Sequence, residues 1–106
     1  LQDVLDLSRR IGSDRLRPLL DSFHMNIEET SMTEPISRAG SDLAHFHLCE
    51  SNGSLLGSGN LDFRAIFQAL ESTGYAKWIS VKVYRQPWAH GAGAAVEHLR
   101  KLQLIP

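Results

Sequence analysis

The chain has 106 residues, of which 42% are hydrophobic and 22% are charged. This composition and length fit one globular domain at most, over residues 1–106, with a core large enough to fold without disulfide bonds. A formal net charge of −1 gives no electrostatic reason to expect a nucleic acid or an anionic membrane as partner. The single cysteine, Cys49, excludes an internal disulfide framework and is typical of a reducing compartment. We therefore expect a soluble, cytoplasmic α/β domain.

The first part of the chain alternates between helix and strand. A helix over residues 1–11 ends at Gly12, and an extended apolar run follows over residues 16–25. A capping-box spacing at residues 31–34 then predicts a short helix that runs through Ala39.

The second part repeats this alternation. A strand over residues 43–50 is followed by the glycine-rich connector SNGSLLGSGN and by a helix that ends at Gly74. Residues 78–84 form the third predicted strand, and apolar residues from Ala95 to Leu102 mark a closing helix. The order of three strands alternating with four helices predicts right-handed crossovers and a parallel sheet.

Ionisable side chains share one face of each predicted strand, while apolar side chains share the opposite face. Successive side chains along a strand point to opposite faces, which is why the two sets separate. In parallel α/β folds, ligands bind at the carboxyl ends of the strands, where these polar faces meet. The face that carries the ionisable side chains holds Leu19 and Asp21 in the first strand, His45 and His47 in the second, and Ser80, Lys82 and Tyr84 in the third.

Each of these residues also has an interpretation that needs no ligand. An aspartate at a strand end is often a helix cap, and a histidine in a strand is often a hydrogen-bonded core residue. Together, Asp21, His24 and His47 offer a carboxylate and two imidazoles, a set suited to divalent Mn, Co or Zn. Lys82 on the same face works against a metal, because an ammonium close to a divalent ion costs several kcal/mol.

Other candidate sites carry weaker signals. The neighbouring Glu28 and Glu29 would face opposite ways in an extended segment, and the glycine-rich connector lacks the lysine of a phosphate loop. Cys49 and His47 share a strand face without a third orienting group, so a nucleophilic role has little support. Trp88 and His90 follow the last strand, where they would cover a bound ligand or pack against a neighbour.

Three segments, taken in order, resemble one known group of proteins. LLDSFHMNIEE (19–29), HFHLCESNGSLLGSGNLDF (45–63) and IFQALESTGYAKWISVKVY (66–84) are similar to segments of the ketose 3-epimerase and sugar-phosphate isomerase/epimerase group, within the xylose isomerase-like TIM barrels. The similarity covers nearly the whole chain with the right spacing. The resemblance implies a partial (β/α) barrel domain.

The resemblance also implies roles for single residues. It implies that Asp21 and His47 are metal ligands, and that His24 contacts the substrate or, as in the related endonuclease branch, binds the metal. Glu50 and Trp88 are assigned to substrate binding, and Lys82 occupies the position of a catalytic glutamate. The implied cofactor is a divalent metal (Mn, Co, Mg or Zn), and the implied substrate is a ketose or sugar phosphate. In this group, two glutamates that also bind the metal move a proton at C3 through an enediolate-like intermediate.

This sequence departs from the group's pattern in three places. One glutamate of the pair belongs to a strand that would precede residue 1, and the other falls where this chain has Lys82. An arginine common in the group falls near Gly53. The charges of Asp21, His47 and Lys82 sum to zero, so we expect weak or absent metal binding and an incomplete or inactive catalytic site.

A complete barrel of this type has eight strands and about 250 residues, so three strands cannot close one. An open parallel sheet exposes two edges and one face, and we expect a homo-oligomer that completes or shields it. The alternative to an epimerase is a non-catalytic oligomeric remnant of such a barrel that binds a small ligand or a protein. A nucleic-acid enzyme of the related endonuclease branch is disfavoured by the lack of a basic patch.

Overall fold

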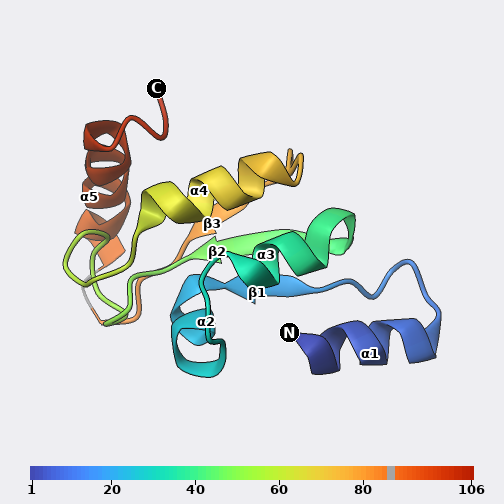
Figure 1. The fold of residues 1–106 in the computed structure, drawn as a ribbon. Coiled ribbons are helices and arrows are strands. Elements are labelled where there is room, and N and C mark those ends of the chain that lie inside the picture. Colours follow the sequence, from blue (N-terminus) through green and yellow to red (C-terminus); the bar gives the residue numbers. More distant parts are fainter. Residues whose placement is uncertain (86–87) are drawn as a thin grey trace.

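The computed structural model describes residues 1–85 and 88–106, without the side chains of residues 88 and 89. It contains a three-stranded sheet, five α-helices and one 3₁₀ turn within these residues (Figure 1). The elements in chain order are α1 (Gln2–Ile11), β1 (Leu19–Asp21), α2 (Ser22–Glu28), α3 (Glu34–Ala39), η1 (Gly40–Asp42), β2 (His45–Leu48), α4 (Phe63–Ser72), β3 (Ile79–Val81) and α5 (Trp88–Lys101).

The three strands form a parallel sheet in the order β1-β2-β3. Asp21 pairs with His47 across the first two strands, and His47 pairs with Ser80 across the second two. Figure 1 shows α3 and α4 running along the sheet, with α1 and α5 at opposite ends of the molecule. The predicted parallel α/β alternation is confirmed.

The core lies between the sheet and its helices. Phe46 and Leu48 of β2 are fully buried, whereas the alternate residues His45 and His47 are only partly buried. This alternation places one apolar face against the helices and leaves one polar face open, as the sequence predicts. Phe46 and Leu48 pack in one core cluster with apolar residues of three helices: Met25 of α2, Ile36 and Ala39 of α3, and Phe63, Ile66 and Leu70 of α4.

The first strand is shorter than predicted, because its last residue begins a helix. Asp21 is the N-cap of α2, and its Oδ1 accepts hydrogen bonds from the backbone N–H groups of Phe23 (3.0 Å) and His24 (3.4 Å). A carboxylate at the N-cap satisfies N–H groups that the first helical turn leaves unpaired. The prediction of an extended segment as far as residue 25 was therefore wrong, and α2 is a fifth helix.

Two later boundaries also differ from the predicted ones. β3 covers only Ile79–Val81, although the backbone N–H of Lys82 still donates to the carbonyl of Leu48 at 2.9 Å. α5 begins at Trp88, before the apolar spacing that starts at Ala95. In the part of the chain described here, no helix is both long and apolar enough to span a membrane.

Candidate functional site

The candidate site lies on the open face of the sheet, where the three strands end. Asp21 ends β1, His47 lies beside it in β2, and Lys82 follows β3 directly. Parallel pairing brings the three side chains to one edge, so residues 61 positions apart in the sequence form a direct contact. The sequence prediction that these polar faces meet is thus realised in the geometry.

The carboxylate of Asp21 is buried and fully used. Only 6% of the residue is exposed. While Oδ1 caps α2, Oδ2 lies 3.4 Å from Nδ1 of His47 and 3.3 Å from Nζ of Lys82. A buried charge of this kind is tolerated only when it is paired and hydrogen-bonded. Asp21 thus serves both as a helix cap and as the partner of a cation.

Lys82 is held between Asp21 and the ring of Tyr84. Its Nζ lies 4.5 Å from the ring centroid, a cation–π distance. The side chain of Tyr84 and then the carboxylate of Asp21 raise the pKa of Lys82, while burial acts in the opposite direction. Lys82 is therefore an ammonium at neutral pH, and its side chain is 38% exposed on the open face.

An aromatic group borders this cation. The hydroxyl of Tyr84 lies 3.2 Å from Nε2 of His24, and the rings of Tyr84 and Phe23 are 5.1 Å apart. His24 and Phe23 are both on α2, so the helix that Asp21 caps also supplies this group. His24 consequently faces Tyr84, whereas its predicted contact with a substrate stays a prediction.

The predicted metal ligands come together only in part. Asp21 and His47 are neighbours, but the part of the chain with described positions contains no group of three or more His, Cys, Asp or Glu residues that could hold a metal ion. The ammonium of Lys82 also takes the oxygen of Asp21 that would face such an ion. The residues present therefore do not fit a divalent cation.

A second pair of polar side chains, His45 and Ser80, lies on the same face, two residues before His47 and Lys82 along β2 and β3. Nε2 of His45 and Oγ of Ser80 are 2.8 Å apart, and the rings of His45 and His47 are 5.2 Å apart in an edge-to-face arrangement. The open face is thus lined by side chains that bond across neighbouring strands. It is a polar surface, suited to water and hydroxyl-rich ligands.

Glu50, predicted to bind substrate, is enclosed by the loop that follows β2. It is 1% exposed, and Oε1 accepts hydrogen bonds from the backbone N–H groups of Ser51 (2.9 Å) and Leu61 (3.2 Å). Oε2 accepts one from the backbone N–H of Gly57 at 2.9 Å. Burial alone would raise the pKa of Glu50, but these backbone donors outweigh it and lower the pKa. Its contact with a sugar stays a prediction, while the geometry shows that it organises the loop.

One link between the first residue of α2 and the residue after β2 was missed in the sequence. Oγ of Ser22 donates to the carbonyl of Cys49 (2.6 Å) and accepts from the N–H of Cys49 (2.7 Å). Burial, followed by the charge of Asp21, raises the pKa of the Cys49 thiol to about 11. Cys49 is therefore an inert buried thiol at neutral pH. A small hydroxyl residue directly after a strand-ending aspartate was the available signal.

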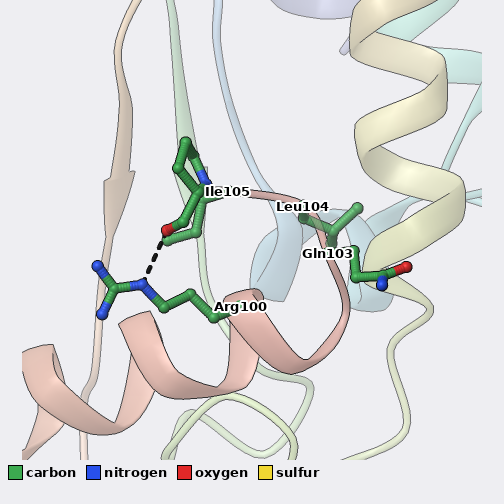
Figure 2. Close-up of a pocket in the computed structure, with 5 residues that line it drawn as sticks. Arg100, Gln103, Leu104 and Ile105 are labelled. Atoms are coloured by element: carbon green, nitrogen blue, oxygen red, sulfur yellow. Dashed lines mark hydrogen bonds between the residues drawn. The ribbon is translucent and has the colours of Figure 1, made fainter.

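Other features lie away from this site or outside the described side chains. The side chain of Trp88, a predicted substrate contact, lies outside the described residues. Figure 2 shows an open hollow at the C-terminal tail, where Nε of Arg100 donates to the carbonyl of Pro106 at 2.8 Å. That hollow carries none of the predicted site residues. A smaller one, of about 220 Å³, lies between α1 and α2 and includes Asp21 and His24.

Known proteins are similar to this chain in both sequence and fold. The chain is 43% identical to the D-psicose 3-epimerase of Enterocloster bolteae over 74 aligned residues, and this alignment covers 70% of this chain and 25% of that protein. It is 44% identical over 73 residues to the L-ribulose 3-epimerase of Mesorhizobium japonicum, covering 69% and 25%. The crystal structure of D-allulose 3-epimerase from Methylomonas sp. in complex with D-allulose matches with a TM-score of 0.80 and 28% identity, over 92% of this chain and 40% of that chain.

These matches also show how long the chain is compared with its relatives. The chain spans about a quarter of the length of the curated ketose 3-epimerases that it matches. Its three parallel strands accordingly form part of a barrel, which confirms the predicted fold class. The profile of the xylose isomerase-like TIM barrel family matches residues 1–102, and the chain belongs to that family.

Proposed function

We propose that this chain forms the ketose-binding part of an epimerase-type barrel in which metal-assisted proton transfer is disabled. The relatives act on ketoses by name, and the open face keeps the polar lining that a sugar needs. The observation that carries the proposal is the cluster of Asp21, His47 and Lys82 at the carboxyl ends of three adjacent strands. Such strand ends are where barrels of this kind bind their ligands.

The loss of proton transfer rests on the identity of residue 82. A proton-transfer pair needs two groups that can accept and donate a proton on either side of the substrate. Lys82 is held as an ammonium by Tyr84 and Asp21, so it is not a base at neutral pH. Asp21 has both oxygens engaged, and it therefore serves to hold Lys82 in place.

The test is to measure binding and turnover of the same sugar separately. Binding of D-psicose is followed by NMR chemical-shift changes, and conversion to D-fructose is followed by chromatography, each with and without added Mn²⁺. We expect binding that weakens at least about tenfold in His47→Ala, with no conversion under either condition. Conversion that requires Mn²⁺ and is lost in Asp21→Ala would refute the disabled site.

A second candidate function is a non-catalytic, self-associating remnant of such a barrel. The observation that favours it is the set of apolar side chains exposed at the sheet edges and on α1: Val4, Leu7, Ile11, Leu19 and Trp78, which is 84% exposed. Exposed apolar patches and sheet edges are typical sites of association. Sedimentation analysis that finds an oligomer, together with no sugar binding, would support this function over the first.

A further inference from the structure

We infer that Lys82 and Tyr84 are the ketose-binding donors of this chain, and that the site takes an uncharged ketose without a divalent cation. The inference rests on the proposed function and adds the groups that bind the sugar where no metal is held. Its starting point is geometric: Nζ of Lys82 lies at the position on the open face where Asp21, His47 and Tyr84 converge.

The ammonium of Lys82 can donate a hydrogen bond to a ligand. An ammonium has three N–H groups; one is directed to Oδ2 of Asp21 at 3.3 Å, and another lies beside the side chain of Tyr84, which raises the pKa of Lys82. With its side chain 38% exposed, Lys82 can direct the remaining N–H group to a carbonyl or hydroxyl oxygen. A charged donor gives a stronger hydrogen bond than a neutral one.

Tyr84 supplies the second donor beside it. Its hydroxyl lies 3.2 Å from Nε2 of His24, and Tyr84 is 45% exposed. In the tautomer of His24 that carries the proton on Nε2, the imidazole donates to the tyrosine oxygen and the single phenolic O–H is left for a ligand. The ring is fixed between Phe23 and the ammonium of Lys82. The phenolic O–H of Tyr84 and the ammonium of Lys82 thus form a pair of donors held close together. Neighbouring oxygens of a ketose are acceptors at a fixed spacing, which such a pair can bind.

The charge of the site selects an uncharged sugar. The ammonium of Lys82 is already neutralised by the carboxylate of Asp21, which lies in direct contact with it. Because Asp21 offsets the ammonium, the site has no net positive charge to hold a phosphate group, whose own charge would have to be desolvated near a buried carboxylate. A neutral ketose carries no such cost.

The experiment measures the Kd of D-psicose by NMR titration in EDTA-treated protein, and compares it with the Kd of D-fructose 6-phosphate. Removal of a charged hydrogen bond weakens binding by about 10- to 100-fold, so we expect that loss in Lys82→Met and a smaller one in Tyr84→Phe. Lys82→Arg should stay within a fewfold of the parent because it keeps a cation. The matched control Lys101→Met, at an exposed lysine of α5, should leave the Kd unchanged.

A separate arm tests the cation itself. Free Mn²⁺ is measured by electron paramagnetic resonance with the parent, Lys82→Gln and Lys82→Glu, and we expect tighter Mn²⁺ binding only in Lys82→Glu. The inference is overturned if Mn²⁺ tightens D-psicose binding to the parent, if Lys82→Met binds as the parent does, or if the ketose phosphate binds more tightly. In each of these outcomes the parent still binds a ketose and the proposed function stands. Absence of ketose binding in the parent and in every variant would overturn both.

Discussion

Replacing Glu50 with glutamine tests whether this buried carboxylate holds the loop over the site. The carboxylate accepts three backbone hydrogen bonds, from Ser51, Gly57 and Leu61, and it is 1% exposed. Glutamine has the same shape but only one acceptor oxygen. If that oxygen stays with Ser51 and Leu61, the new NH₂ group faces the N–H of Gly57.

The expected cost follows from this one mismatch. A hydrogen bond to a charged acceptor contributes about 1.5–3 kcal/mol, and an unsatisfied donor costs about 1–3 kcal/mol. Because Gly57 itself is exposed, water can satisfy part of its N–H. We therefore expect Glu50→Gln to lower the free energy of unfolding by about 2 kcal/mol.

The effect should also depend on pH in a defined direction. The backbone donors hold the folded-state pKa of Glu50 below its ordinary value of 4.5. Its contribution is thus fully present above the unfolded-state pKa and is lost as pH falls through the lower folded-state pKa. The stability difference between the parent and Glu50→Gln should accordingly be constant near neutral pH and shrink below about pH 4.5.

Urea unfolding at several pH values measures this difference, and hydrogen exchange of the Gly57 amide reports the loop directly. Glu97→Gln is the matched control, because Glu97 is exposed on α5 and pairs only with Lys101 within the described residues. We expect the control to leave both measurements unchanged. Equal stability of Glu50→Gln and the parent at pH 7, or a difference that does not change with pH, would refute the reasoning.

Two further predictions concern the same region. Gly57 has a φ of +86°, and a Cβ there would lie 2.4 Å from the ring of His98, so Gly57→Ala should cost about 1–3 kcal/mol in urea unfolding. Gly93→Ala, in α5 with open space around it, should be neutral or stabilising in the same assay. Cys49, with a thiol pKa of about 11 against 9.0, should react with a disulfide reagent about 100-fold more slowly when folded than when unfolded.

The parts of the fold that depend on side-chain periodicity were predictable. Alternation of His45, Phe46, His47 and Leu48 predicted both the strand and its two faces. The end of β1 was not predictable from hydrophobicity, because the apolar run continues through Phe23 and Met25. A single local interaction, the capping carboxylate of Asp21, decides that boundary.

The site was predictable as a meeting of faces but not as a set of bonds. Parity placed Asp21, His47 and Lys82 on one side of the sheet, and the structure joins them. The contact of His24 with Tyr84 depends on the turn from β1 into α2, which the hydrophobic pattern does not predict. Likewise, the enclosure of Glu50 depends on a loop whose path no periodicity describes.

Gly53, near which the arginine of the resembling group falls, and Lys82 both contact Tyr84. The carbonyl of Gly53 accepts the backbone N–H of Tyr84 at 2.8 Å, and a Cβ at Gly53 would lie 3.2 Å from Cδ2 of that ring. With a φ of +70° as well, a side chain at position 53 would be strained and would press on the ring of Tyr84. Lys82 in turn stacks on Tyr84, so moving the ring would remove one of its two supports. A side chain introduced at position 53 and a change of Lys82 should therefore act through the same ring, that of Tyr84.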